Sequence, residues 1–427
     1  MAPRLVQTYG AVGGELNEEA CTLASQPEPV KFPLPPSPVP YDTGPEVRAL
    51  AARCPVTRVE LPDGSLAWAV TGFSEVREVL IDQRYSRALA CAPDRPRQGM
   101  EYLLAESLMG MDPPGHSRLR KLAASAFTEK RMQVLRPEVT RIVDSLLDEM
   151  IAGPRPADLV RSFSLPLPSR VICSLLGVPP DHLDTFHGWS NTLFADWSRT
   201  KEEMDEAYSA INGYMAGLIA AKRKEPADDL ISALIDARDS GDKLSEDELV
   251  RFCFGLLMAG HETTANQLNM SLVALCHHPA ELARLRADPG LIPAAVEELL
   301  RFVQITGKAG IPPARITREE VSLGGVTIPA GEAVLPMMNV ANRDPVAFSD
   351  PNQLDLLREP KTNIAFGAGA HHCLGAQLAR MELQEGLRGL LTRLPGLRMA
   401  VPLSEVEFRE GHLLASMREL PVTWDDS

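Results

Sequence analysis

The chain has 427 residues, of which 44% are hydrophobic and 23% charged, so it can bury a large core. Its net charge of −14 argues against a nucleic-acid partner, because phosphate binding needs a concentrated basic face. We find no run of about eighteen apolar residues and no basic leader with an apolar core, so we predict neither a membrane span nor a secretory signal.

The seven cysteines are scattered along the chain, and none of them forms a CxxC pair. Their odd number and wide spacing fit free thiols in a reducing compartment, which predicts a cytoplasmic location. One of them, Cys373, stands in surroundings unlike those of the others.

The first part of the chain is rich in proline, with several prolines between Pro33 and Pro40. We predict a poorly ordered arm and an extended lead-in over residues 1–40, followed by one folded domain over residues 41–427. A short helix is predicted from Glu46 to Arg53. Next comes a hairpin in which Val56–Leu61 and Leu66–Val70 flank a Pro-Asp-Gly-Ser turn.

After this hairpin, helical periodicity dominates the sequence. The predicted helices are Phe73–Ile81, Gly115–Phe127, Thr128–Ile151, Leu165–Leu176, Asp181–Ala195 and Lys201–Arg223. The clearest helix begins at Ser245, where Ser245 and Glu248 form a capping box, and no proline interrupts it before Pro279. At about 1.5 Å per residue this helix would span about 50 Å, so we predict that it is the buried central rod of the fold.

The last third of the chain mixes helices with short strands. A helix is predicted to start at Pro293, a hairpin to join Val321–Ile328 to Ala333–Met338, and a final helix to run from Leu374 to Leu394. Together the patterns predict a single, mainly α domain with small antiparallel β-sheets.

The most informative segment is the glycine-rich loop from Phe366 to Gly375. Cys373 stands where this loop turns into a helix, whose free N–H groups and positive dipole end both lower the pKa of a thiol. Gly367 and Gly369 permit positive φ and let backbone amides approach the sulfur, while Gly375 would leave room for a flat cofactor. The pattern therefore favours a stabilised thiolate beside a planar group.

Other interpretations of the loop fit its residues less well. A dinucleotide-binding loop would need a third glycine where His372 stands. A zinc site made of His371, His372 and Cys373 is geometrically poor, because three adjacent residues rarely converge on one metal. A catalytic Cys–His pair, or an ordinary cysteine in a helix-capping loop, would give the flanking glycines and phenylalanine no task.

The loop resembles the FGxGxHxCxG haem loop of the cytochrome P450 family at every fixed position, and the likeness extends from about residue 40 to the C-terminus. The resemblance implies one cytochrome P450 domain with its long central helix over the haem. It also implies haem b as cofactor, with Cys373 as the axial ligand to the iron. Thiolate ligation favours O–O cleavage. The other loop residues that the resemblance places at the haem are Phe366, Gly367, His371 and Gly375.

Midway along the long helix stands the segment from Ala259 to Thr264. Acidic and hydroxyl groups in an apolar helix are costly to bury unless they have a task. The segment resembles the oxygen-activation motif AGxET of the same family, which implies that Ala259 and Gly260 border the haem. It also implies that Thr263 hydrogen-bonds bound dioxygen and that Glu262 belongs to the proton-delivery route. The alternative is a kinked helix in which the Thr263 hydroxyl bonds back to its own turn.

Two further patterns carry weight only together with the resemblance. Glu298 and Arg301 form an ExxR pair, which by itself is typical of an ion pair on a helix surface. The resemblance implies that this pair joins Arg358 in a network that supports the haem loop. The segment Asp112–Arg120 resembles a propionate-binding DPPxHxxxR motif. The residues that the resemblance assigns to the haem propionates are His116, Arg120, Arg315 and His371.

The resemblance to this family implies a monooxygenase that hydroxylates or epoxidises a bulky apolar molecule, such as a polyketide, macrolide or peptide secondary metabolite. It also implies that electrons come from a ferredoxin and an NAD(P)H-dependent ferredoxin reductase. Two alternatives stay open: a haem-thiolate enzyme of altered chemistry, either peroxide-driven or coupling, and a haem-binding sensor without turnover. From the positions that bind substrate in this family, contacts are expected from Arg87–Leu108, Phe186–Ser198, the long helix around Ala259 and Val303–Pro313.

Overall fold

The computed structural model describes most of the chain. The residues outside the description are 1–27, 36, 93–106, 195–198, 240–244, 304, 306–311, 360–361, 410–411, 413 and 427. Most of the predicted N-terminal arm lies among them, as do most of the expected substrate segments Arg87–Leu108 and Val303–Pro313 and the end of Phe186–Ser198. Of the predicted lead-in, the structure describes a strand, β1 (Val30–Lys31), that pairs in parallel with β2 (Val56–Glu60).

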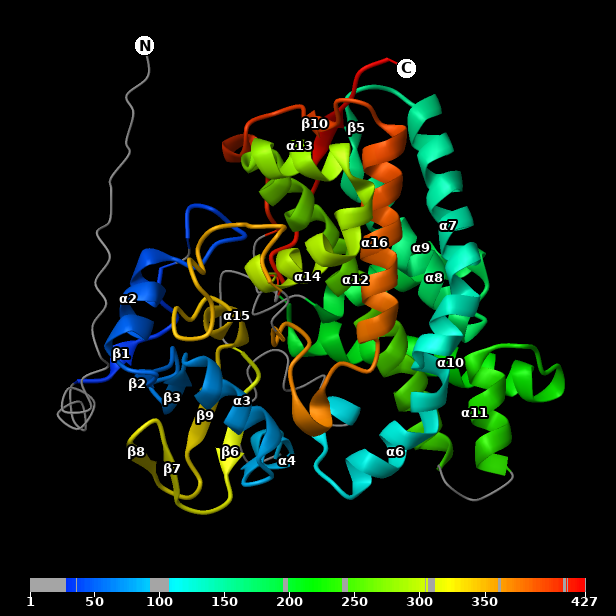
Figure 1. The fold of residues 1–427 in the computed structure, drawn as a ribbon. Coiled ribbons are helices and arrows are strands. Elements are labelled where there is room, and N and C mark those ends of the chain that lie inside the picture. The colour runs from blue at the N-terminus through cyan, green and yellow to red at the C-terminus, as the bar shows by residue number, and fades with distance from the viewer. Residues whose placement is uncertain are drawn as a thin grey trace, which may run out of the picture.

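Helices make up the larger part of the molecule (Figure 1). Their bounds are α2 (Pro45–Arg53), α3 (Phe73–Ile81), α4 (Arg87–Ala90), α6 (Gly115–Ala124), α7 (Glu129–Ala152), α8 (Pro166–Leu176), α9 (Leu183–Leu193), α10 (Lys201–Lys224), α11 (Leu230–Asp239), α12 (Glu246–His277), α13 (Pro279–Ala287), α14 (Ile292–Phe302), α15 (Met338–Ala341) and α16 (Ala376–Arg393). The predicted helices are confirmed to within a few residues at their ends, except that residues 125–127 form a separate 3-10 turn.

The long helix α12 is the central rod that the sequence predicts. Ser245 and Glu248 make the full capping box, since the Ser245 hydroxyl accepts from the Glu248 N–H and the Glu248 carboxylate accepts from the Ser245 N–H. Three acidic residues in its first turn interact favourably with the positive end of the helix dipole and so stabilise the start of α12. Most side chains from Leu249 to Leu275 are buried, and α8, α10 and α16 pack around it. This burial on several sides holds the middle of α12 in a fixed place.

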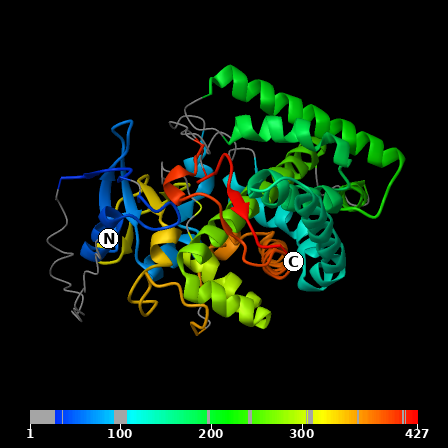
Figure 2. The same cartoon turned by 90° about the horizontal axis from the view of Figure 1, so that it is seen from above.

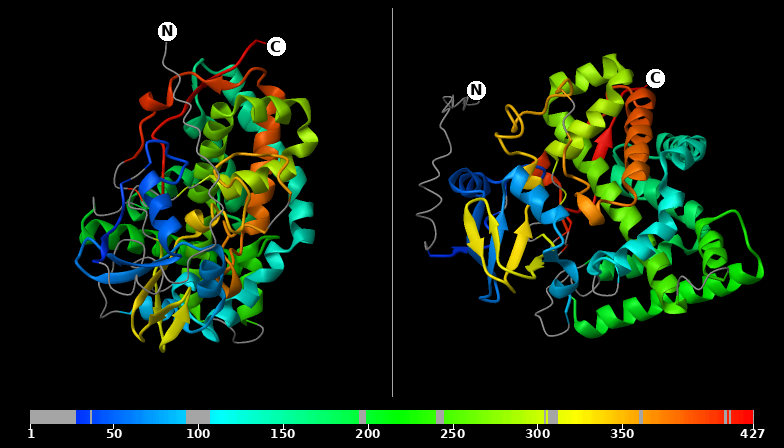
Figure 3. Two further views of the ribbon diagram at one scale, coloured as in Figure 1. Left: turned by 60° about the vertical axis from the view of Figure 1, so that its left-hand side comes forward. Right: turned by 60° about the horizontal axis from the view of Figure 1, so that its bottom comes forward.

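The largest sheet and the β7–β8 hairpin lie beside this helical part, as the views in Figures 2 and 3 show, whereas β5 and β10 lie next to helices near α13 and α16 (Figure 1). The largest sheet has the order β1-β2-β3-β9-β6-β4, and two smaller sheets have the orders β10-β11-β5 and β7-β8. The remaining strands are β3 (Leu66–Val70), β4 (Tyr85–Ser86), β5 (Ala157–Asp158), β6 (Arg315–Thr317), β7 (Val321–Leu323), β8 (Val326–Ile328), β9 (Ala333–Pro336), β10 (Arg398–Met399) and β11 (Pro421–Thr423).

Two predictions about the sheets need correction. The largest sheet is mixed, not purely antiparallel, because β1–β2 and β3–β9 are parallel pairs. The predicted hairpin also divides differently: Gly324 and Gly325, both at positive φ, make a two-residue turn between β7 and β8. β9 then pairs with β3 and β6 instead of with β8.

None of the helices in the described ranges is long and apolar enough to cross a bilayer. Among the cysteines that the structure describes, Cys91, Cys173, Cys253, Cys276 and Cys373 are free thiols. Cys54 is disulfide-bonded, so the prediction of free thiols is wrong at that residue.

Candidate active site

The cysteine loop is held in shape by its glycines and by backbone hydrogen bonds. Gly367 and Gly369 have φ values of 70° and 68°, in the region that favours glycine. A side chain at Gly369 would lie 2.6 Å from the carbonyl oxygen of Leu80, because the loop presses against the end of α3. The Cys373 N–H donates to the Phe366 carbonyl oxygen over 2.8 Å. Cys373 is thereby fixed just before α16, whose N-cap is Gly375.

The charge on the Cys373 thiol is set by opposing effects. Burial raises its pKa, whereas the backbone N–H of Gly375 and the charges of Arg120 and Arg380 lower it. The net direction is upward, so the predicted lowering at the helix N-terminus is present but outweighed. The side chain itself is exposed, so its sulfur can meet a ligand although the surrounding protein is dense. A thiol in this setting becomes a thiolate when a metal cation binds it.

Two arginines and two histidines lie near this loop, and we call the four residues His116, Arg120, Arg315 and His371 the cationic cluster, after the charge of its arginines. The rings of His116 and His371 have their centroids 4.3 Å apart. His116 is 1% exposed, yet neither of its ring nitrogens has a hydrogen-bond partner among the described residues. Buried ring nitrogens normally have hydrogen-bond partners, so the ring of His116 is placed to bind a polar group of a ligand.

The charges of the cationic cluster are poorly balanced. Burial, and then the nearby arginine charges, lower the pKa of Arg315 to about 10 and that of His371 to about 3. Asp112 is the acid that acts on both, but it already accepts hydrogen bonds from Ser86 and pairs with Arg318. The cluster therefore offers desolvated N–H groups and positive potential that suit a carboxylate ligand.

On α12, the residues of the predicted motif point in different directions. Ala259 is exposed and Thr263 half-buried, although both stand at the middle of a mostly buried helix. The Thr263 hydroxyl donates to the Ala259 carbonyl oxygen over 2.9 Å, which is the back-bonding that the sequence left open. The missing side chain of Gly260 would lie 3.0 Å from Cγ1 of Ile172, so Gly260 lets α8 pack closely on α12. Its predicted place beside the haem stays a prediction.

Glu262 is buried and bears an unusual carboxyl group. It is 5% exposed, and its Oε2 atom lacks a hydrogen-bond partner in the described part of the chain. Burial raises the pKa of Glu262 to about 7, and the charge of Arg409 lowers it only partly. Near neutral pH the group can therefore both give and take a proton.

His261 points away from Glu262 and joins α12 to α9. Its Nδ1 atom lies 3.1 Å from the Leu257 carbonyl oxygen, which can only accept, so Nδ1 carries the proton. Nε2 then accepts from the Ser190 hydroxyl of α9 over 3.0 Å. Burial lowers the pKa of His261 to about 3, which keeps the ring neutral. This contact fixes α9 against the segment that precedes Glu262.

The three residues of the predicted network, Glu298, Arg301 and Arg358, lie together, and we call them the bracing triad. Arg301 contacts Glu298 over 2.7 Å and Arg358 contacts it over 3.1 Å. Arg301 also donates to the Asn342 carbonyl oxygen, and the Asn342 side chain accepts from the Ile364 N–H, both over 2.9 Å. These contacts connect α14, through Asn342, to Ile364, two residues before the cysteine loop begins.

Comparison with known proteins gives the family. The cytochrome P450 family model matches residues 181–289 and 290–395. The nocardicin C N-oxygenase of Nocardia uniformis subsp. tsuyamanensis is 48% identical over 91% of this chain and 97% of its own length. The chain belongs to the cytochrome P450 family.

Two more relatives agree with this assignment. The mycinamicin IV hydroxylase/epoxidase of Micromonospora griseorubida is 46% identical over 87% of this chain and 92% of its own length. The LnmA cytochrome P450 hydroxylase from the leinamycin pathway of Streptomyces atroolivaceus S-140 superposes with a TM-score of 0.86. It is 43% identical and covers 92% of this chain and all of its own. The predicted family, fold and monooxygenase class are thereby confirmed.

Membership of the cytochrome P450 family implies a haem-thiolate cofactor, and the residues present fit it. Cys373 offers its sulfur on one side, and exposed Ala259 lies on the central helix. The cationic cluster, with the two unpartnered nitrogens of His116, suits the haem carboxylates. Gly375 has no atom within 4 Å of where a side chain would begin, as a flat ligand against the loop requires.

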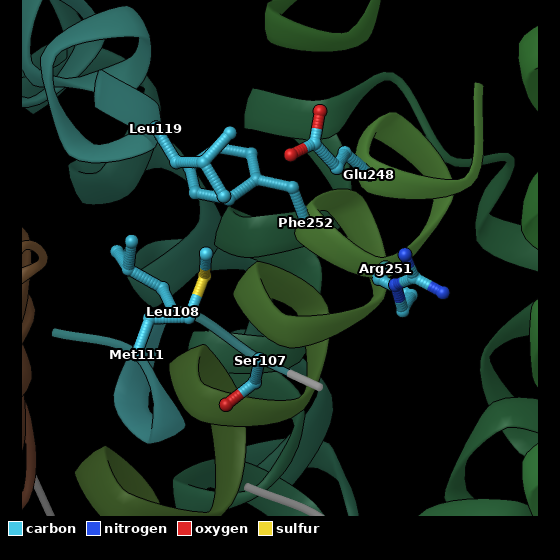
Figure 4. Close-up of a pocket in the computed structure, with 7 residues that line it drawn as sticks. All are labelled: Ser107, Leu108, Met111, Leu119, Glu248, Arg251 and Phe252. Atoms are coloured by element: carbon cyan, nitrogen blue, oxygen red, sulfur yellow. The ribbon is translucent and has the colours of Figure 1, made fainter. Parts of the chain in front are cut away.

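The cytochrome P450 also has a cavity of about 280 Å³ at the start of α12 (Figure 4). Its walls come from α6, from α12 and from the 3-10 turn Leu108–Gly110 with its flanking residues. The lining residues are Ser107, Leu108, Met111, Leu119, Glu248, Arg251 and Phe252. Apolar side chains face one another across it, whereas Glu248 and Arg251 bring charge to its edge.

Sequence reasoning missed several residues of this site. Arg380 lies with its guanidinium carbon 4.6 Å from the centre of the Phe366 ring and pairs with Glu297 over 2.6 Å. Arg409 and His412 come from a loop about 150 residues after Glu262, so no local spacing signals their approach to α12. An aromatic or cationic residue on an irregular C-terminal segment is usually surface, and only packing brings these two inward.

Proposed function

We propose that this cytochrome P450 inserts one oxygen atom from O2 into a bulky, mainly apolar small molecule, by hydroxylation or epoxidation, with haem b as its cofactor. The observations that support this most are the cationic cluster beside Cys373 and, on the central helix, the buried Glu262 with its raised pKa next to Thr263. A haem-binding sensor without turnover would have no need for a buried carboxyl that titrates near neutral pH.

In this proposal each group has one task. Bound through the Cys373 thiolate, the haem supplies the binding and reductive activation of dioxygen. The cationic cluster holds the propionates, and the Gly375 N–H together with Arg120 and Arg380 moderates the charge on the sulfur. The Thr263 hydroxyl gives its proton to the Ala259 carbonyl oxygen, so its own oxygen is left to accept from a water or a ligand. Glu262 holds the proton that the reaction consumes.

For the substrate, we propose a polyketide, macrolide or peptide secondary metabolite. Relatives that cover nearly their whole length include a nocardicin C N-oxygenase and a mycinamicin IV hydroxylase/epoxidase, which supports this class.

For the partners, we propose a ferredoxin and an NAD(P)H-dependent ferredoxin reductase as the electron source, in the cytoplasm. The family generally takes its electrons from a partner protein. Of the described cysteines all but Cys54 are free thiols, which supports a reducing compartment only in part.

The central test is the carbon monoxide spectrum of the reduced, haem-loaded protein. We expect the far-red Soret band of thiolate ligation, and its loss in Cys373→Ala at unchanged haem content. If the band is absent in the parent, or survives in Cys373→Ala, the ligand assignment is wrong. Candidate macrolides and peptides are then screened by the spin-state shift of the ferric protein.

A further inference from the structure

The loop around residues 408–417 reaches the buried face of α12 near Glu262. Phe408 and Met417 form a β-bridge across it, and the Arg409 N–H donates to the Ser416 carbonyl oxygen over 2.8 Å. The Ala415 N–H donates to the Ile305 carbonyl oxygen over 2.9 Å, and the Arg409 guanidinium donates to the Asn191 side chain of α9. These contacts hold the described residues of the loop against both α9 and the segment after α14.

His412 is brought by this loop to Glu262. Its Nδ1 atom lies 4.0 Å from Glu262 Oε2, and the two side chains are 7% and 6% exposed. Both atoms are buried, and neither has a hydrogen-bond partner among the described residues. An unsatisfied buried polar atom costs about 1–3 kcal/mol, so two of them facing each other are satisfied together, by a small approach or by one bridging water.

The protonation states of the pair suit proton transfer better than an ion pair. Burial, and then the charge of Arg409, lower the pKa of His412 to about 4, while burial raises that of Glu262 to about 7. Between these values the carboxyl is protonated and the imidazole neutral. Arg409 is the charge that acts on both groups, and His261, the next residue on α12, is neutral and directed to α9.

We propose that His412 is the residue that returns protons to Glu262 during turnover. When Glu262 has given its proton toward Thr263, Nε2 of His412 takes a proton from hydronium in the solvent as the Nδ1–H bond breaks and a new O–H bond forms on Glu262. The ring stays neutral, and it returns to the Nδ1–H form by proton exchange with solvent water before the next turnover. This role rests on the proposed function, but the contact that it requires is a property of the protein itself.

The contact is tested by infrared titration of the haem-loaded protein between pH 5 and pH 9. The carboxyl band that disappears with rising pH is assigned by its absence in Glu262→Gln. Glu382, another buried acid, has a pKa raised well above its usual value by burial and cancels in the difference spectrum. In His412→Phe we expect the midpoint to rise by about one pH unit, because the carboxylate loses the N–H group that the proposal brings within hydrogen-bonding reach. An unchanged midpoint would overturn the proposal.

Passage of the proton is tested with His412→Gln, whose amide can donate to Glu262 but cannot relay a proton. We expect its titration midpoint to stay near that of the parent. Its rate of NADPH oxidation, with ferredoxin, reductase and dioxygen but no added substrate, should fall about tenfold and show a larger solvent isotope effect. A parent-like rate and isotope effect in His412→Gln would also overturn the proposal.

The control is His182→Phe, the same substitution at an exposed histidine, which hydrogen-bonds Tyr214 and not Glu262. It should change neither the midpoint nor the rate. Should His412→Phe not fold, His412→Gln decides the matter by its rate. Failure of the proposed function would instead appear as absence of the thiolate Soret band, whatever the infrared titration gives.

Discussion

Glu298 and Glu262 are two glutamates that are almost equally buried, at 6% and 5% exposure, on neighbouring helices of one core. Glu298 is surrounded by groups that match its charge: Arg301, Arg358 and the Asp355 N–H all donate to it. Glu262 has Arg409 as a more distant charge and an Oε2 atom without a partner in the described chain. The same side chain thus has charged and N–H partners in one place, whereas in the other burial without such partners makes it easily protonated.

The comparison assigns a structural role to Glu298 and a role in proton transfer to Glu262. A buried carboxylate whose partners are all in place stabilises one arrangement, and it loses much when a partner is removed. A buried carboxyl with too few partners is energetically unfavourable when ionised, and it therefore exchanges its proton near neutral pH. The four changes below test the contrast between the bracing triad and Glu262.

The largest effect is expected from Glu298→Gln. The change leaves Arg301 and Arg358 without their shared carboxylate, so we expect a loss of about 3–5 kcal/mol in the free energy of unfolding, with lower haem retention. Urea titration and haem content measure both. Glu407→Gln, at an exposed pair with Arg418, is the control and should lie within about 0.5 kcal/mol of the parent. A parent-like Glu298→Gln would remove the bracing role.

Glu262→Gln should raise, not lower, the free energy of unfolding relative to the parent as the pH rises. Because the native pKa is about 7 and the ordinary value 4.5, the native state keeps a proton that the unfolded state has lost between these pH values. This group's contribution to stability therefore falls as the pH rises through that window, by about 3 kcal/mol in all. The glutamine variant lacks this fall, so it should gain on the parent from pH 4.5 to 7.

His412 also changes the pH dependence of the free energy of unfolding, and its contribution is removed by subtracting the variant's curve from the parent's. Its native pKa of about 4 lies below the ordinary 6.5, so its contribution rises with pH across that range and partly offsets the fall from Glu262. The informative quantity is thus the parent-minus-variant difference at each pH, from urea titrations. A difference that is flat from pH 4 to 8 would show that the Glu262 carboxyl is not perturbed.

Thr263→Ala should alter chemistry with little change in stability. We expect substrate binding to persist while product formed per NADPH falls about tenfold and peroxide rises, because the hydroxyl beside Ala259 is lost. Product, NADPH and peroxide are measured together. Thr264→Ser, one residue further along α12, is the control and should stay coupled. Equal coupling in Thr263→Ala and the parent would show that another group replaces the hydroxyl.

Gly260→Ala should have the smallest effect. Overpacking against Ile172 costs about 1–3 kcal/mol, while replacing a helical glycine by alanine returns about 1 kcal/mol, which leaves a net loss of about 1 kcal/mol. Ile172→Val in the same chain should restore stability if the contact with α8 is the cause. Haem loss that Ile172→Val does not restore would instead place Gly260 beside the cofactor.

The fold followed well from sequence where local rules are strong. The capping box at Ser245 and the absence of proline up to Pro279 predicted α12 nearly to the residue. Pairing partners of short strands carry little local signal, so the parallel β3–β9 pair and the separate β7–β8 hairpin were not predicted. Such pairings depend on which elements meet in space.

What the sequence by itself determined is the chemistry at residue level: a cysteine in a glycine loop before a helix, an acid–alcohol pair on a central helix, and an ExxR pair. These are local patterns, because each depends on spacings within a few turns of one element. Only the tertiary structure decided which buried glutamate has two arginine partners and which has a carboxyl oxygen without one in the described chain. The partners of Glu298 and Glu262 arrive from the segment around Arg358 and from the loop around His412, and the pKa of a buried carboxyl depends on the groups that surround it in space.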